Sequence, residues 1–324
     1  MATNFTDDIG PMAYPLKMVS KEVVEHMLGW NIPEEHQDLV HEHWRNFPAV
    51  SKYWHYVLAL IYTMLMVTSL LGNGIVIWIF GTSKSLRSPS NMFVINLAVF
   101  DLMMMLEMPL LIMNSFYQRL VGYQLGCDIY AVLGSLSGIG GAITNAVIAF
   151  DRYKTISCPL DGRINKVQAA ILIAFTWFWA MPFTILPALK IWGRFVPEGF
   201  LTTCSFDYFT DDQDTKVFVG CIFVWSYAIP MALICYFYSQ LFGAIPESYG
   251  RSLLTPIATM VPAVCCKVVS CIDPWVYAIN HPRYRAELQK RLPWMGVREQ
   301  DPDSVSTTTS VATAQSTAQP TAEA

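Results

Sequence analysis

The chain has 324 residues, of which 53% are hydrophobic and only 14% are charged, and its formal net charge is −4. This composition excludes a soluble domain with a charged surface and indicates a protein embedded in lipid. A soluble helical bundle is the alternative, and the length of the apolar runs argues against it. We therefore expect a membrane as the chain's surroundings and no nucleic-acid partner.

Six apolar runs are long enough to cross a membrane, since a helix needs about 20 mostly apolar residues to span the hydrocarbon core. Lipid offers no water to the backbone, so each run is predicted to be a helix. The runs are Trp54–Phe80, Met92–Ser115, Ile129–Phe150, Val167–Leu189, Val217–Phe242 and Leu253–Ile279. The predicted fold class is all-α, a membrane-embedded helix bundle over residues 51–282.

The two ends of the chain are polar. Residues 1–50 carry charges throughout and lack the apolar core of a signal peptide, so the first span is expected to act as the targeting signal. Asn4 begins a glycosylation sequon, which is usable only if this end is extracellular. The C-terminal tail, residues 296–324, is rich in Ser, Thr and Ala without apolar periodicity, and we predict that it is disordered.

Positive charges in the short loops predict the orientation. Lys84 and Arg87 follow the first span, and Arg152, Lys154, Arg163 and Lys166 follow the third, whereas the loop after the second span holds only Arg119. By the positive-inside rule the N-terminus is then extracellular. Of the eight cysteines, only Cys127 and Cys204 lie at extracellular positions, so these two are expected to form a disulfide.

Four charged residues lie within the apolar runs, where each costs roughly 2.5–3.5 kcal/mol on insertion. Asp101 and Glu107 are in the second run, and Lys267 and Asp273 are in the last. Asp101 and Asp273 are interpreted either as functional groups or as a polar pair that only packs helices. A lysine near the middle of its run is too deep to snorkel. It either pairs with a carboxylate or forms a Schiff base, which in a membrane pocket suggests a hydrophobic aldehyde.

Several short motifs occur in order on these spans. They are Asn73 in "LLGNGIVIWIF", Asp101 in "NLAVFD", Asp151, Arg152 and Tyr153 in "AFDRYKTISCPLDGR", Trp177, Pro230 with Tyr238, and Asp273, Pro274 and Tyr277 in "CIDPWVYAINHPRYR". Together they resemble the rhodopsin-like G-protein-coupled receptors, and within them the arthropod visual opsins, over about residues 50–295. The resemblance also implies an amphipathic helix on the membrane surface over residues 283–295.

Lys267, seven residues before Pro274, matches the lysine that binds retinal in opsins. The resemblance implies 11-cis-retinal (or 3-hydroxyretinal) as the cofactor, with Glu198, six residues before Cys204, as the counterion of the protonated Schiff base. Tyr130 resembles the aromatic residue found where vertebrate pigments carry their counterion. The alternatives are that Glu198 is a solvated loop residue and that Tyr130 only packs.

Glu107 bears on colour. Insect ultraviolet opsins resemble this sequence but carry a lysine at the position of Glu107, and that positive charge would favour an unprotonated Schiff base. A carboxylate at this position does not oppose the protonated form of the Schiff base. This residue and its surroundings in "DLMMMLEMPLLIMNSFYQRL" resemble the insect blue-sensitive branch.

The resemblance also implies how the chain would signal. Isomerisation of retinal would move the sixth helix outward. Arg152 would then leave Asp151 and contact a G protein of the Gq type, and Tyr238 and Tyr277 would stabilise the open state. Arrestin and a receptor kinase would act at the C-terminal tail. The expected location is the rhabdomere membrane of a photoreceptor, and no enzyme activity is expected.

The resemblance fails between Tyr238 and Lys267. Only the linker "GAIPESYGRS" separates the last two apolar runs, so the sixth helix and the third cytoplasmic loop are not encoded. Six spans would also put the C-terminus outside, translocating Arg283, Arg285, Lys290 and Arg291 against the positive-inside rule. Either the sequence lacks an exon of a normal opsin, or it is a splice form that does not fold into a competent receptor.

Three other functions compete. An ion transporter or channel would use Asp101, Glu107, Lys267 and Asp273 along its path, but the sequence has no internal repeats or interrupted half-helices to support it. A retinal photoisomerase would bind the chromophore without signalling, and the intact Asp151-Arg152-Tyr153 argues against it. A defective isoform would retain its full-length partner in the endoplasmic reticulum.

Overall fold

The computed structural model describes residues 27–157, 163–244, 272–274 and 281–297. Within these residues, five helical segments are long and apolar enough to cross a membrane: Lys52–Thr82, Pro89–Tyr117, Tyr123–Ser157, Lys166–Ala188 and Gln213–Gln240. They overlap the first five predicted spans, and they confirm the all-α class. The sixth predicted span, Leu253–Ile279, lies outside the described residues except at its end, where residues 272–274 are helical.

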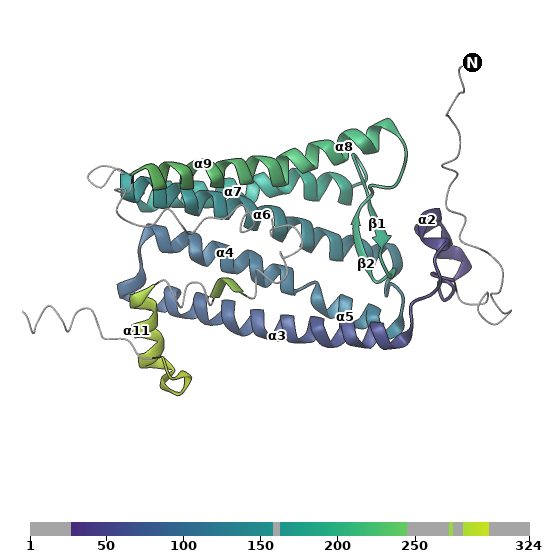
Figure 1. Cartoon of the computed structure of the whole chain (residues 1–324), viewed down its shortest axis with the longest axis horizontal. Coiled ribbons are helices and arrows are strands. Elements are labelled where there is room, and N and C mark those ends of the chain that lie inside the picture. Colours follow the sequence, from purple (N-terminus) through teal and green to yellow (C-terminus); the bar gives the residue numbers. More distant parts are fainter. Residues whose placement is uncertain (1–26, 158–162, 245–271, 275–280, 298–324) are drawn as a thin grey trace, which may run out of the picture.

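The first two spans lie side by side (Figure 1). The first is α3 (Lys52–Thr82), and the second is divided into α4 (Pro89–Met105) and α5 (Met108–Tyr117). Pro109, near the start of α5, has no N–H to continue the ladder of α4, which explains the break at Leu106 and Glu107. The sequence prediction treated this stretch as one span.

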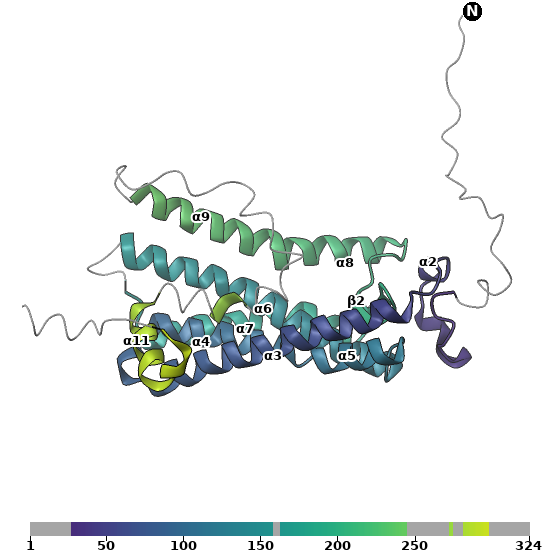
Figure 2. The same ribbon diagram turned by 60° about the horizontal axis from the view of Figure 1, so that its bottom comes forward.

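The third and fourth spans are α6 (Tyr123–Ser157) and α7 (Lys166–Ala188). Asn165 caps α7 by accepting a hydrogen bond from the Gln168 N–H at 2.9 Å, and the Gln168 side chain accepts one in return from the Asn165 N–H at 3.1 Å. The fifth span consists of α8 (Gln213–Phe223), a π-helical turn η3 (Val224–Ala228) and α9 (Ile229–Ala244). It forms an outer layer beside α6 (Figure 2).

Asn96 on α4 joins the second, third and fourth spans. Its amide nitrogen donates to the hydroxyls of Thr144 at 3.0 Å and Thr176 at 3.1 Å, and its oxygen accepts from the indole N–H of Trp177 at 2.9 Å. These buried hydrogen bonds are strengthened by the apolar surroundings. They also give Trp177, noted from its motif alone, a structural role.

A two-stranded hairpin lies across one end of the bundle (Figure 1). Strand β1 (Phe195–Glu198) pairs antiparallel with β2 (Thr203–Phe206), with Glu198 opposite Thr203. At the turn, Leu201 has a φ of +57° and is 1% exposed, because its side chain packs against Leu28, Ile32 and Val40. These three residues belong to a folded N-terminal segment that includes the short helices η1 (Glu34–Leu39) and α2 (Glu42–Arg45). The sequence prediction described residues 1–50 only as an extracellular tail.

At the opposite end, α11 (Pro282–Arg291) crosses the end of α3 and is followed by the turn η5 (Pro293–Met295) (Figures 1 and 2). Tyr284 and Leu288 are buried against α3, in a cluster that includes Phe80. The guanidinium of Arg291 donates to the hydroxyls of Thr82 at 2.6 Å and Ser83 at 2.9 Å. The helix expected over residues 283–295 is therefore attached to the first span at both of its ends.

Candidate functional site

The disulfide between Cys127 and Cys204 fixes the hairpin to the bundle. Cys127 lies in the first turns of α6, Cys204 lies on β2, and their Cα atoms are 5.4 Å apart. Both residues are buried, at 0% and 5% exposure. The pairing expected from their extracellular positions is present, and it ties the strand next to Glu198 to the third span.

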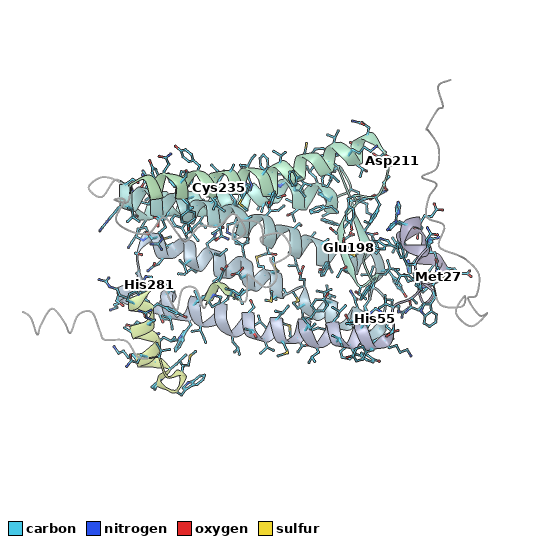
Figure 3. The ribbon with its side chains drawn as sticks, viewed as in Figure 1. Met27, His55, Glu198, Asp211, Cys235 and His281 are labelled. Carbon is cyan, nitrogen blue, oxygen red and sulfur yellow. A yellow bond between two sulfur atoms is a disulfide. The ribbon has the colours of Figure 1, made fainter. Side chains whose placement is uncertain are left out.

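Glu198, the predicted counterion, is half-buried at the end of β1 (Figure 3). Its carboxylate accepts a hydrogen bond from the Tyr208 hydroxyl at 2.9 Å. Burial and this hydrogen bond to Glu198 raise the pKa of Tyr208 to about 12, so the hydroxyl stays protonated and remains a donor at neutral pH. Tyr208, which sequence reasoning missed, therefore holds the Glu198 side chain.

Glu107 and Tyr130 lie in one buried region below the hairpin. Glu107 is 1% exposed and Tyr130 is 5% exposed. The Glu107 carboxylate is directed at α6, where a Cβ on Gly134 would lie only 2.7 Å from its oxygen. Gly134 is four residues after Tyr130, so the two lie on the same face of α6. Tyr130 shares an apolar cluster with Cys127, Cys204 and several methionines of the second span.

This region has the chemistry that a retinal site requires. It offers a buried carboxyl group in methionine-rich apolar surroundings, and the lack of a side chain at Gly134 lets that carboxyl group pack closely against α6. Such surroundings suit an apolar polyene that carries one buried positive charge. Lys267, the predicted attachment point, lies outside the described residues, as do Tyr277 and Asn4.

A second group of predicted residues meets in the middle of the bundle. Asp101 on α4 is 6% exposed, and its side chain is hydrogen-bonded to that of Asp273 in the last span. Asn73 on α3 donates to the Ser69 carbonyl at 3.2 Å and hydroxyl at 3.0 Å. A Cβ on Gly72 would lie 2.8 Å from the Pro274 ring, so α3 touches the last span here.

The acidic-Arg-Tyr motif lies at the end of the bundle that carries α11. Asp151 is 1% exposed and accepts a hydrogen bond from Ser90 at 3.1 Å, a partner that the sequence did not indicate. Arg152 and Tyr153 are half-buried, and the Tyr153 ring lies 5.8 Å from that of Phe237 on α9. Tyr238 is 40% exposed.

Asp207, just after β2, organises the base of the hairpin. Its carboxylate accepts hydrogen bonds from Arg194 at 2.7 Å and from the backbone N–H groups of Phe209 and Thr210, each at 3.1 Å. Burial alone would raise the pKa of Asp207, but the hydrogen bonds from Thr210, Arg194 and Phe209 outweigh it and lower that pKa below 3.8. The carboxylate therefore stabilises the fold above pH 3.8, and this contribution is lost as the pH falls through the lowered pKa.

We expect Asp207→Asn to lower the free energy of unfolding by about 1–3 kcal/mol, because hydrogen bonds to a buried charge are lost. Thermal unfolding of the two proteins followed from pH 7 to pH 3 measures this, and the difference between them should shrink at the acidic end. Asp211→Asn is the control, since Asp211 forms an ion pair with Lys216 but is 85% exposed, and exposed pairs contribute little. Equal effects of the two substitutions would contradict the role given to Asp207.

Comparison with known proteins identifies the family. The family described as 7 transmembrane receptor (rhodopsin family) matches residues 72–253. Opsin-3 of Manduca sexta is 76% identical, with 97% of this chain and 98% of that protein covered. The blue-sensitive opsin of Apis mellifera is 53% identical, with 89% and 91% covered. The crystal structure of squid rhodopsin superposes with a TM-score of 0.72 at 26% identity, covering 82% of this chain and 87% of that one.

The chain therefore belongs to the rhodopsin family of transmembrane receptors, and within that family to the insect opsins. It is an integral membrane receptor of the visual-pigment class, with retinal as its chromophore and a G protein as its partner, and not an enzyme. The alignment with the Manduca protein runs over 375 positions, 51 more than the 324 residues of this chain, so it includes positions at which this chain has no residue.

Proposed function

We propose that this chain is the apoprotein of a blue-sensitive visual pigment in which Lys267 holds 11-cis-retinal, or 3-hydroxyretinal, through a Schiff base. When bound, retinal supplies the light-driven isomerisation. The observation that carries the proposal is the 76% identity with Opsin-3 of Manduca sexta. The blue-sensitive opsin of Apis mellifera is 53% identical and the ultraviolet-sensitive opsin of the same insect is 45% identical, which favours the blue assignment.

The protein's own groups hold the charge at the chromophore. A buried cation sheds its proton unless a carboxylate stabilises it, and Glu198 is the proposed counterion. The Tyr208 hydroxyl, at 2.9 Å, orients the Glu198 carboxylate, and the disulfide at Cys204 holds the strand opposite. Glu107 and Tyr130 line the buried region. A carboxyl group at Glu107, unlike a lysine, does not oppose the protonated form of the retinal Schiff base.

The remaining motif residues form the proposed signalling path. Arg152, with Asp151 and Tyr153, is assigned to contact with a Gq-type G protein. The residues assigned to the change of state that precedes this contact are Asn73, Asp101, Tyr238, Asp273, Pro274 and Tyr277. Arrestin and a receptor kinase are proposed to act on the C-terminal tail, and the rhabdomere is the proposed membrane.

Substitution of Lys267 tests this function. We expect the chain reconstituted with 11-cis-retinal to develop a visible absorption band, and we expect Lys267→Ala to abolish it, because only an amine can form the Schiff base. Lys166→Ala, at an exposed lysine at the start of α7, should keep the band. A band that survives in Lys267→Ala would refute the attachment site, and no band in the parent chain would refute the pigment function of this chain.

A second function is supported by the Manduca alignment, in which this chain has no residue at more than 51 positions. We infer that the region between Phe242 and Leu253 lacks the sixth helix and third cytoplasmic loop, which would leave an isoform that retains full-length opsin in the endoplasmic reticulum. Long-read sequencing of eye transcripts across these codons tests it. Transcripts that always encode another apolar span there would rule the isoform out, and abundant transcripts with this junction would support it.

A further inference from the structure

His281 caps the first turn of α11. Its Nδ1 accepts a hydrogen bond from the backbone N–H of Tyr284 at 3.2 Å, while its carbonyl accepts from the N–H groups of Tyr284 and Arg285 at 3.0 and 3.1 Å. The imidazole ring also packs edge-on against Phe80 of α3, with centroids 5.6 Å apart. Figure 3 shows His281 at the junction between the bundle and α11. A helix of ten residues thus begins on a side chain that titrates.

The groups around His281 favour its neutral form. Burial lowers the pKa of His281 below 6.5, and the positive charges of Arg152 on α6 and Arg283 on α11 lower it further. The N-terminal end of a helix also repels a cation. Of the carboxylates described at this end, Asp151 accepts from Ser90, and Glu287 is bonded to Ser83 and Arg291.

We propose that His281 is a positioning residue of the G-protein contact face, which as a neutral imidazole fixes the start of α11 beside Arg152 and on protonation releases it. This proposal rests on the function proposed above, in which Arg152 contacts the G protein. Protonation removes the cap because an imidazolium has no lone pair on Nδ1 and cannot accept the hydrogen bond from the Tyr284 N–H.

Loss of the His281 cap loosens only the first turn of α11. Tyr284 lies in that turn, with its ring stacked on Phe80 at a centroid distance of 5.2 Å, so loss of the cap loosens this contact as well. The far end stays attached through Arg291 and its bonds to Thr82 and Ser83. Because the pKa of His281 is lowered on folding, the capped form is fully present above pH 6.5 and is lost as the pH falls through the lowered value.

Hydrogen exchange of the full chain in lipid nanodiscs, without retinal or G protein, tests the proposal. After correction for intrinsic rates, we expect protection of the amides of residues 284–286 to fall about five- to tenfold between pH 7.5 and pH 5.5, as for a lost helix cap. His281→Asn supplies an oxygen acceptor that does not titrate, so protection should be retained at both pH values. His281→Ala should be poorly protected at both.

The start of α7 is the internal control, because Asn165 caps it without titrating and its amides should show no change. Protection of α11 that does not depend on pH in the parent chain would overturn the proposal. So would a pH dependence that persists in His281→Asn. Failure of the chain to bind retinal would leave this result unaffected, and a null result here would leave the assignment of Lys267 intact, so the two failures are distinguishable.

Discussion

A Gly140→Ala variant is expected to lose roughly 1–3 kcal/mol of stability, although alanine is normally the better helix former. A Cβ at this position of α6 would lie 2.3 Å from the Phe100 ring, which is fully buried. Phe100 packs on Trp177 at a centroid distance of 4.5 Å, and Trp177 is hydrogen-bonded to Asn96. The ring cannot move without disturbing the contact that joins three spans. The midpoint of thermal unfolding in nanodiscs measures the loss.

Gly138→Ala provides the matched control for that prediction. Gly138 lies two residues earlier on α6, and among the described residues no heavy atom outside the adjoining part of α6 itself lies within 4 Å of the place its Cβ would occupy. Removing a helical glycine there should raise stability by up to about 1 kcal/mol. Equal unfolding midpoints for the two variants would show that the close approach of α4 and α6 at Gly140 does not exist.

Cys204→Ser is expected to lower the free energy of unfolding more than any other substitution considered. The disulfide joins residues 77 apart in the sequence. The loop-entropy relation for such a loop gives about 4–5 kcal/mol at room temperature, an upper figure because engineered and native bridges often deliver less. The hairpin would lose its covalent link to α6, and with it the fixed position of Glu198 and Tyr208. Unfolding midpoint and cell-surface level should both fall.

Cys221→Ser and Cys235→Ser are the controls for the disulfide prediction. Both cysteines are exposed and unpaired. Their replacement should change the unfolding midpoint little, since surface substitutions are usually worth less than about 0.5 kcal/mol. If Cys204→Ser behaves like these two under oxidising conditions, the bridge does not stabilise the folded chain.

Much of the fold was predictable because lipid imposes a simple rule. Apolar run length indicated five spans whose observed ends differ from the predicted ones by one to seven residues. The charges of the loops placed Cys127 and Cys204 on the extracellular, oxidising side, which indicated that these two cysteines pair. The folded segment before Lys52 was not predicted, since its helices are short and its stability depends on a distant contact with Leu201. The break at Glu107 was also missed, although Pro109 was a readable signal.

The candidate site divides in the same way. Motif residues such as Asn73, Asp101 and Asp151 were found because their order along the chain is distinctive. Their partners were not found. Tyr208 lies after β2 and Glu198 on β1, while Ser90 lies on α4 and Asp151 on α6. Because each bond joins two different elements, neither partner has a fixed sequence spacing from the residue to which it is bonded. His281 was passed over because a histidine before a proline has no strong sequence meaning.

Borohydride reduction after incubation with 11-cis-retinal, followed by peptide mapping, is the measurement that bears most directly on the pigment assignment. Reduction converts a Schiff base into a stable amine, so the attached lysine can be identified by mass. We predict one retinyl group on Lys267 and none on the exposed lysines of the loops. A label on another lysine, or no label at all, would contradict the assignment of this chain as a retinal-binding opsin.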